Sequence, residues 1–211
     1  MKNRKKRLII LLFDYDGTII DSVNLAYKIF KNIAKEYGLA SPKSIKHFVE
    51  FYNINFYESL LTRGLLKIHL SKFINEFRQP FLDYEKKMKI FPYMKETIKK
   101  LSKKAKIFII TSNLSDVIES SIKAHKIEHV SAVIGADNGI GKVNAIKLIK
   151  KRFPKAIIYY IGDTSGDMIE AKKAGVKTIG VTWGYHSRLK LKETDPDFIV
   201  SAPKDLLKII D

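Results

Sequence analysis

The hydrophobic positions of the chain follow two kinds of pattern, and the change between them divides the sequence. A continuous apolar run from Leu8 to Phe13 predicts a strand buried on both faces. Between residues 21 and 88 apolar residues recur at helical spacing, and no segment there indicates a convincing strand. From residue 89 onward short apolar runs alternate with helical segments. These β-α repeats predict an α/β core with a doubly wound parallel sheet, formed by residues 1–20 and 89–211, and an all-helical domain at 21–88.

The apolar runs and helical repeats also place the elements of the predicted core. Strands are expected at 8–13, 107–110, 130–134, 157–161, 176–181 and 198–200. Helices are expected at 117–124, 142–152, 168–174 and 206–210, and Phe91-Pro92 opens another. At the start of the helical domain, Asp21-Ser22 is expected to cap the first helix, because short polar side chains accept hydrogen bonds from the free amides of a helix start.

Composition limits the class of protein. The chain has 211 residues, 45% of them hydrophobic, and no cysteine. The length is enough for one domain with an insertion. The lack of cysteine excludes disulfides and thiolate metal sites. The basic start, Met1 to Arg7, imitates a signal peptide, but the apolar run after it is too short and ends in Asp14. No segment approaches the roughly 20 apolar residues of a membrane span, so we expect a cytoplasmic protein that does not enter a membrane.

The chain is strongly basic, with 39 Lys and Arg against 22 Asp and Glu and a net charge of +17. A basic field attracts small anions and also nucleic acid. The excess is spread over most predicted helices, and no nucleic-acid-binding module is recognisable. We therefore expect a small anionic substrate and no specific nucleic-acid partner. The sequence is compatible with either a monomer or a homodimer.

Polar residues stand at the C-terminal ends of four predicted strands or in the loops that follow them. They are Asp14 and Asp16, then Thr111, Ser112 and Asn113, then Lys142, and finally Asp163 and Asp167. Because parallel strands end at one edge of a sheet, we expect these residues to converge. Carboxylates suit a hard cation such as Mg²⁺, while a lysine and hydroxyl groups suit phosphate oxygens. The alternative for residues 13–18, an Asp-Gly turn that merely carries a second acid, leaves the other strand ends unexplained.

The predicted geometry assigns a role to each of these groups. A carboxylate at a strand tip can attack phosphorus and form an aspartyl-phosphate, and Asp14 is the candidate. Asp16 lies two residues on and on the same side, where it can protonate the leaving oxygen and then activate water. Thr111 and Lys142 complete the predicted catalytic set. The predicted phosphate-binding residues are Thr111, Ser112, Asn113 and Lys142, and the predicted Mg²⁺ ligands are Asp14, Asp16, Asp163 and Asp167.

These segments, in order, resemble the four motifs of the haloacid dehalogenase superfamily. The motifs are DxDGT at 14–18, Thr-Ser-Asn at 111–113, the loop lysine, and GDxxxD at 162–167. The helical domain resembles the C1-type cap of that family. The stretch from Ile161 to Tyr185 is most similar to the phosphoglycolate phosphatase branch. The resemblance implies a Rossmann-like core and a Mg²⁺-dependent phosphatase for a small phosphorylated metabolite, with 2-phosphoglycolate as the first candidate.

The sequence departs from the family pattern after the loop lysine and leaves several functions open. Lys142 is followed by Val143-Asn144 rather than Pro-x-Pro, so Lys147, one turn further on, is an alternative phosphate-site lysine. Before the second motif, Pro-Tyr at 92–93 replaces the usual Pro-Gly. A phosphomutase of the β-phosphoglucomutase type, a pyrophosphatase or nucleotidase, and a phospho-accepting signalling receiver are the alternative functions. Arg63, Lys67 and His69 of the helical domain are expected to be solvated helix residues rather than substrate contacts.

Overall fold

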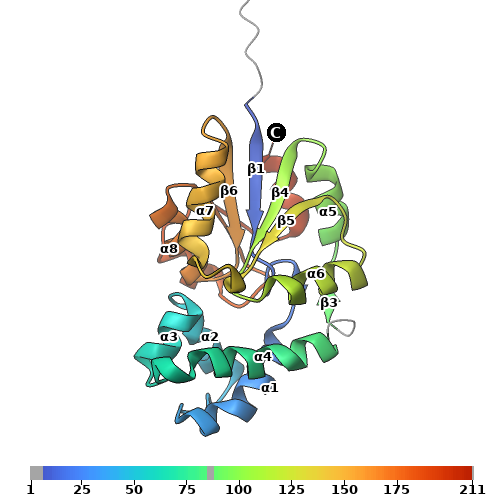
Figure 1. The fold of residues 1–211 in the computed structure, drawn as a ribbon. Helices are drawn as coiled ribbons and strands as arrows, with labels where there is room; N and C mark the ends of the chain where they lie inside the picture. Colours follow the sequence, from blue (N-terminus) through green and yellow to red (C-terminus); the bar gives the residue numbers. More distant parts are fainter. Residues whose placement is uncertain (1–6, 85–87, 211) are drawn as a thin grey trace, which may run out of the picture.

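The computed structural model of the protein describes residues 7–84 and 88–210, apart from the side chain of Arg78 (Figure 1). The basic start of the chain at 1–6 and the end of the predicted helical domain at 85–87 therefore lie outside the described residues. Six strands form one sheet in the order β5-β4-β1-β6-β7-β8, and all neighbours are parallel. They are β1 (Ile9–Phe13), β4 (Ala105–Ile110), β5 (Val130–Ile134), β6 (Ile157–Gly162), β7 (Lys177–Val181) and β8 (Phe198–Val200). The predicted α/β fold is confirmed.

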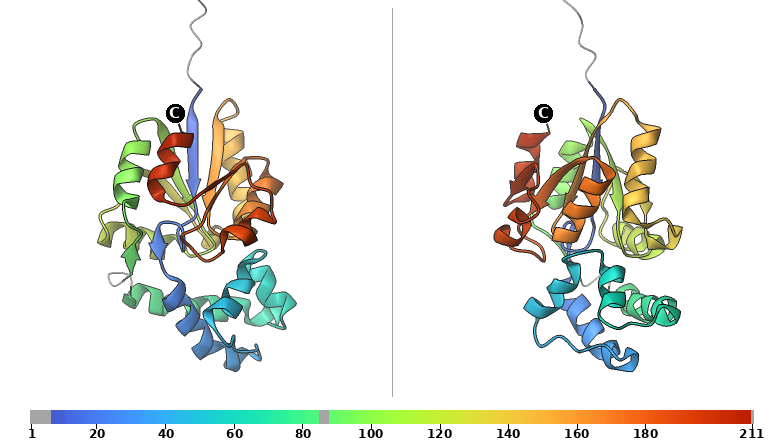
Figure 2. Two further views of the ribbon diagram at one scale, coloured as in Figure 1. Left: turned by 180° about the vertical axis from the view of Figure 1, so that it is seen from behind. Right: turned by 90° about the vertical axis from the view of Figure 1, so that its left-hand side faces the viewer.

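Strand β1 lies inside the sheet between β4 and β6, and helices cover both of its faces (Figure 2). Successive side chains of a strand point to opposite faces. Leu11 and Phe13 accordingly pack with residues of α5 (Met94–Leu101), α6 (Ser115–Ala124) and α10 (Leu206–Ile209). Ile10 and Leu12 pack with residues of α7 (Gly141–Arg152), α8 (Ser165–Ala174) and α9 (Arg188–Lys192). This double burial explains why every residue of β1 is apolar.

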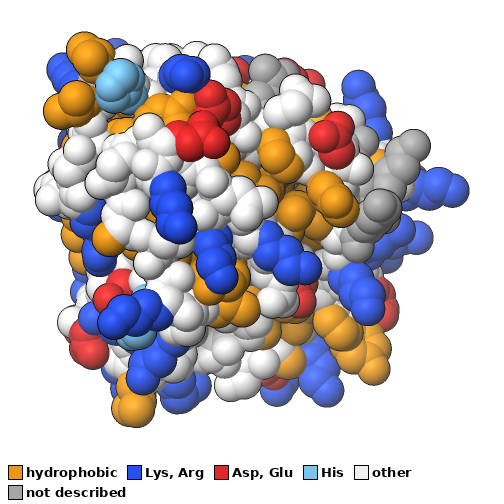
Figure 3. Space-filling model, turned by 90° about the horizontal axis from the view of Figure 1, so that it is seen from below, with side chains coloured by type: hydrophobic (Ala, Val, Ile, Leu, Met, Phe, Trp, Pro, Cys, Tyr) orange, Lys and Arg blue, Asp and Glu red, His pale blue; other side chains and the backbone are white. Residues whose placement is uncertain are grey.

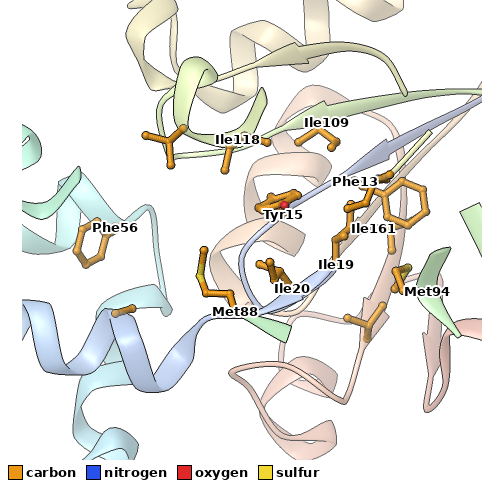
Figure 4. Packing of buried hydrophobic residues seen from close by; sticks show 14 of the residues in the cluster. Phe13, Tyr15, Ile19, Ile20, Phe56, Met88, Met94, Ile109, Ile118 and Ile161 are labelled. Carbon is orange, nitrogen blue, oxygen red and sulfur yellow. The ribbon is translucent and has the colours of Figure 1, made fainter. Parts of the chain in front are cut away.

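A helical insertion, residues 23–84, lies beyond the C-terminal ends of the strands (Figure 1). Its α-helices are α1 (Val23–Ile33), α2 (Ile45–Val49), α3 (Phe56–Thr62) and α4 (Leu70–Tyr84), with 3-10 turns at Ala34–Tyr37, Glu50–Tyr52 and Lys67–His69. Aromatic rings fill its centre: the ring of Phe30 lies 4.7 Å from that of Phe51, 5.4 Å from Phe48 and 5.8 Å from Phe73, between centroids. The apolar core continues from the sheet through Tyr15, Ile20 and Met88 toward the insertion (Figure 4).

The connection between core and insertion differs from the sequence prediction. Residues at both ends of the insertion pair as a short antiparallel ribbon of β2 (Ile20–Asp21) and β3 (Lys89–Ile90), although no strand was expected in either segment. Two-residue strands are too short to leave a hydrophobic pattern. Ser22 is the N-cap residue of α1, as expected, but its side chain makes no capping bond, and its hydroxyl lies 3.0 Å from the Tyr185 hydroxyl.

The helices and the surface of the protein bear on the expectations about membranes and charge. Among the described residues, no helix has both the length and the apolarity that crossing a bilayer requires. Lys and Arg side chains are scattered over the face seen from the side of the insertion, rather than gathered in one stripe (Figure 3).

Candidate active site

The C-terminal ends of the central strands bring the predicted residues together. Asp14 follows β1, and its amide donates to the carbonyl of Ile161 on β6 at 2.8 Å. The amide of Thr111, which follows β4, donates to the carbonyl of Ile134 on β5 at 3.1 Å. These backbone bonds extend the parallel pairing one residue beyond the strands and fix where the side chains start. Seven predicted residues line one cavity beneath the insertion: Asp14, Asp16, Thr111, Ser112, Asn113, Lys142 and Asp167.

Three buried acids form the centre of the site. Ligand-type oxygens of Asp14, Asp163 and Asp167 all lie within 4.8 Å of one another. The three residues are 7%, 0% and 2% exposed, respectively, so little water reaches their carboxylates. The ammonium of Lys142 lies 2.6 Å from an oxygen of Asp167 and 3.5 Å from an oxygen of Asp14. One buried cation thus faces three buried carboxylates.

Asp163 is held by the loops around it. One of its oxygens accepts from the Thr18 hydroxyl at 2.9 Å, and the other accepts from the Tyr185 amide at 2.7 Å. Gly17, which precedes Thr18, has φ +78°, and a Cβ there would collide with an oxygen of Asp163. Only glycine meets both requirements at low cost, since other residues avoid positive φ. The glycine of the DxDGT segment therefore allows β1 and β6 to bring their acids together.

Asp167 and Lys142 are positioned by helix starts. Asp167 closes a capping box at the start of α8, where one oxygen accepts from the Thr164 hydroxyl at 2.7 Å and from its amide at 3.1 Å. Its other oxygen is the one that accepts from Lys142. Lys142 lies in the first turn of α7 with its side chain 5% exposed, whereas Lys147 is exposed on the same helix. Of the two candidate lysines, the structure brings Lys142 to the acids.

The charges of this group influence one another strongly. Burial raises the pKa of Asp14 well above its usual range, against the opposing attraction of Lys142. Burial, with Asp167 nearby, raises the pKa of Asp163 to about 8. Burial lowers the pKa of Lys142, but Asp14 and Asp167 outweigh it and hold that pKa above the usual value. Lys142 therefore stays protonated, while Asp14 and Asp163 hold a proton more readily than ordinary carboxyl groups do.

Asp16 occupies a different position from the acid cluster. One of its oxygens accepts from the Asn113 amide group at 3.1 Å. The other is buried and has no hydrogen-bond partner among the described residues. Burial raises the pKa of this carboxyl. Its side chain is not among the three clustered acids, which separates it from the ligand set predicted from sequence.

The segment after β4 forms a polar wall of the cavity. The Thr111 hydroxyl accepts from the Asn113 amide at 3.1 Å, and the Asn113 side-chain oxygen accepts from the Leu114 amide at 2.8 Å. The turn is tied to the insertion, since the Tyr57 hydroxyl donates to the carbonyl of Ser112. Three of the predicted phosphate-binding residues thus lie in one hydrogen-bonded turn that lines the same cavity as Lys142.

Sequence reasoning missed the residues that close the cavity. They come from the insertion, from α8 and from the loop after β7: Tyr52, Asn55, Phe56, Tyr57, Glu170 and Tyr185. The Asn55 side chain donates to Glu170 at 3.0 Å, and the His186 ring lies 2.9 Å from the carbonyl of Val49. Glu170 could have been found, because it lies one helical turn after Asp167. The others carry no spacing signal. The enclosed space of ≈ 70 Å³ open to water-sized groups suits a small molecule.

The three basic residues of the insertion considered from sequence lie outside the described cavity lining. Arg63, Lys67 and His69 are exposed or half-buried. The guanidinium of Arg63 stacks on the ring of Phe51 at 4.2 Å.

The donor set of the cluster fits a divalent cation. All of its ligand atoms are carboxylate oxygens, which is the chemistry that Mg²⁺ prefers. Isolated negative charge is costly to bury, and one lysine cannot balance three carboxylates. A bound divalent cation would favour the charged forms of Asp14 and Asp163, whose pKa values burial raises.

A sequence profile described as "Haloacid dehalogenase-like hydrolase" matches residues 11–181 of the chain. The chain belongs to the haloacid dehalogenase-like hydrolases. This confirms the resemblance seen in the four motifs and the prediction of an enzyme, and it disfavours the signalling receiver. The matched segment contains both the acid cluster and the insertion.

Full-length relatives of this haloacid dehalogenase-like hydrolase are named phosphatases and pyrophosphatases. It is 30% identical over 223 residues to a phosphoglycolate phosphatase of Aquifex aeolicus, covering 96% of each chain. It is 24% identical over 204 residues to a phosphoglycolate phosphatase of Synechococcus elongatus, covering 95% of this chain and 96% of the other. It is 24% identical to a pyrophosphatase PpaX of Bacillus cereus, covering 95% of each. The similarity to the phosphoglycolate phosphatase branch is confirmed.

Solved structures share the whole architecture of this hydrolase. A haloacid dehalogenase-like family hydrolase from Streptococcus pneumoniae aligns with a TM-score of 0.80 at 24% identity, covering 97% of this chain and 99% of the other. A predicted phosphatase from Clostridium acetobutylicum aligns with a TM-score of 0.82 at 22% identity, with the same coverage. At this identity the likeness concerns the fold, including the helical insertion after the first strand.

Proposed function

We propose that the protein is a Mg²⁺-dependent phosphomonoesterase that acts on a small phosphorylated metabolite through a phosphorylated Asp14. The observation that carries the proposal is the meeting of Asp14 with Lys142, Asp163 and Asp167 in one buried cluster, at a cavity that Asp14, Lys142 and Asp167 line. A nucleophile, a fixed cation and a candidate metal site in this arrangement suit attack on a phosphate ester.

In the first step an oxygen of Asp14 attacks the phosphorus, and the bond from phosphorus to the ester oxygen breaks. The leaving alkoxide needs a proton, and Asp16 is suited to donate it. Its raised pKa favours the protonated form before transfer, and one of its oxygens has no other partner among the described residues. Asn113 holds the other oxygen and so orients the carboxyl group. The alcohol leaves and Asp14 carries the phosphoryl group.

In the second step water replaces Asp14 on the phosphorus. The carboxylate of Asp16, now deprotonated, takes a proton from the attacking water. The bond from phosphorus to the Asp14 oxygen breaks, inorganic phosphate leaves, and both acids return to their starting forms. The same residue thus serves first as acid and then as base.

The negative charge of the substrate requires cationic partners. Lys142 provides one that stays protonated, and the turn at 111–113 provides hydroxyl and amide groups. Mg²⁺ held by Asp14, Asp163 and Asp167 would supply positive charge beside the phosphate oxygens and reduce their repulsion from Asp14. Thr18, Thr164 and the Tyr185 amide orient the other two acids for this role.

The relatives suggest which phosphate compounds to test. Two of them are named phosphoglycolate phosphatases, which makes 2-phosphoglycolate the first candidate. The pyrophosphatase name of another makes pyrophosphate the second. A phosphomutase would use the same first step and differ only in the acceptor of the phosphoryl group.

Replacement of the nucleophile tests the proposal. Asp14→Asn should abolish Mg²⁺-dependent hydrolysis of a generic aryl phosphate, because an amide oxygen cannot form the phosphorylated intermediate. The matched control is Asp195→Asn at a fully exposed side chain, which should leave turnover unchanged. Acid quenching during turnover of a labelled substrate should trap base-labile label on the native chain and none on Asp14→Asn. Turnover retained by Asp14→Asn would exclude this nucleophile.

A further inference from the structure

Glu170 is a buried acid of the cavity that the proposed reaction does not use. It lies on α8 one turn after Asp167, is 8% exposed, and lines the same cavity as Asp14 and Lys142. Acidic side chains are rarely buried unless they are paired or have a ligand to contact. The Asn55 side chain, which comes from the insertion rather than from the core, donates a hydrogen bond to Glu170 at 3.0 Å.

Glu170 lies in the cavity where the core meets the insertion, because its hydrogen-bond partner Asn55 belongs to the insertion. A phosphate bound at Asp14 between Lys142 and the turn at 111–113 must direct its alcohol portion toward the insertion, which closes the cavity. Glu170 stands at that boundary, since its partner Asn55 begins α3. Aromatic rings of Tyr52, Phe56 and Tyr57 line the same space. The alcohol portion therefore meets aromatic rings and one carboxylate.

We propose that Glu170 selects the leaving group: it favours phosphomonoesters whose alcohol portion carries a hydroxyl or ammonium group and disfavours those that carry a second anion. A carboxylate accepts hydrogen bonds from such donors, and a ligand ammonium is also attracted by aromatic faces. A carboxylate or second phosphate on the substrate meets a like charge in a site with little water, which is a repulsive element of specificity. The inference rests on the proposed phosphomonoesterase activity and changes its order of substrates: it ranks 2-phosphoglycolate and pyrophosphate, which the names of the relatives suggest, below neutral and cationic esters.

Four esters of one carbon framework test this selection. They are 2-hydroxyethyl phosphate, 2-aminoethyl phosphate, 2-phosphoglycolate and ethyl phosphate, which differ only in the group at the far carbon. For the native protein with Mg²⁺, kcat/KM should be about tenfold or more higher for the first two than for 2-phosphoglycolate, because a buried charge discriminates strongly against its own sign. Ethyl phosphate, with no polar group, should lie between them.

Three variants separate selection by charge from a structural role. Glu170→Gln keeps an oxygen for Asn55 but removes the charge, and it should reduce the preference for 2-aminoethyl phosphate over 2-phosphoglycolate by about tenfold or more. Glu170→Asp keeps the charge and should preserve the order of substrates. Asn55→Ser keeps an oxygen that can accept from the amides of Tyr57 and Glu58 but removes the donor to Glu170. The Asn55→Ser variant should change KM by about the same factor for all four esters.

The outcomes distinguish the two proposals. If the native protein hydrolyses none of the esters and no aryl phosphate, the proposed function fails. If it hydrolyses them but Glu170→Gln leaves their order unchanged, the role of Glu170 is overturned while the function stands. The role is also overturned if Asn55→Ser produces the same change in order as Glu170→Gln, since closure of the insertion would then be responsible. Should Glu170→Gln fail to fold, a preference of the native protein for 2-phosphoglycolate over the other three esters overturns it.

Discussion

Asp163 is fully buried in the acid cluster, so its replacement by asparagine tests whether the cluster is built to hold a cation. Asp163→Asn removes one of three clustered charges and keeps the shape of the side chain. An amide oxygen can still accept from the Thr18 hydroxyl. The amide nitrogen then faces the Tyr185 amide, which loses its acceptor. We expect the variant to be more stable than the native protein when no divalent cation is available, and to respond less to Mg²⁺.

The size of the effect follows from the raised pKa of Asp163, which is about 8 against an ordinary value of 3.8. Because the folded-state pKa lies above the unfolded one, the folded state binds more protons between these values, and stability falls as pH rises through them. Since pH 7 lies about 3 units above the ordinary pKa and below the raised one, the stability lost by pH 7 amounts to roughly 4 kcal/mol at 1.36 kcal/mol per unit. The unpaired Tyr185 amide costs about 1–3 kcal/mol. The net gain is about 2 kcal/mol, or roughly 4–8 °C in Tm for a chain of this size.

The assay is urea unfolding of both proteins in EDTA at pH 5 and pH 8, followed by the fluorescence of Trp183, the one tryptophan of the chain. The native protein should lose stability from pH 5 to pH 8, and the variant should lose less. Adding Mg²⁺ at pH 8 should raise the unfolding midpoint of the native protein more than that of the variant. Asp195→Asn serves as the control for an exposed site. The reasoning is refuted if the native protein is equally stable at both pH values and Mg²⁺ stabilises both proteins alike.

Two further predictions concern the lysine and the contact between insertion and core. Lys142→Met should lower kcat/KM by about 10³ or more and, in EDTA, the free energy of unfolding by about 3–5 kcal/mol, because a buried ion pair loses one partner. The free energy of unfolding of Lys147→Met should stay within about 0.5 kcal/mol of the native value. Equal losses of kcat/KM and of stability in the two variants would contradict the placement of Lys142 in the site. Tyr57→Phe should raise KM about five- to tenfold, because the insertion loses its hydrogen bond to the carbonyl of Ser112. Tyr27→Phe, which loses a bond to the carbonyl of Pro42 within the insertion, is its kinetic control, and an equal rise in KM there would contradict the explanation.

The sheet could be predicted from sequence because its strands are buried on both faces. Such strands need uninterrupted apolar runs, and the run ending at Phe13 is the clearest of them. The ribbon of β2 and β3 could not be predicted, because two residues contain no period. Ser22 shows a different limit: a residue type suited to capping α1 is used instead for a contact with Tyr185, which is 163 positions away in the chain. Local preference gave way there to tertiary contact.

The choice between Lys142 and Lys147 could have been made from helical phase. Ala145, Ile146 and Ile149 form the apolar face of α7, and Lys142 shares that face. Lys147 lies five positions after Lys142, about 140° away around the helix, and is exposed. The absence of Pro-x-Pro after Lys142 was therefore less informative than the spacing of the apolar residues that follow it.

The proposed reacting groups and the proposed substrate-facing residues differ in how the fold positions them. Asp14 and Asp163 follow parallel strands directly and Asp16 comes two residues after Asp14, so their positions in the sequence translate into positions in space. Tyr57 and Asn55 reach the cavity only because the insertion packs against the core, and no spacing within 23–84 encodes that contact. The type of reaction can therefore be inferred from sequence, whereas the class of substrate requires the packed structure. Glu170 connects the two sets, since α8 fixes its position relative to Asp167 while Asn55 brings the insertion to it.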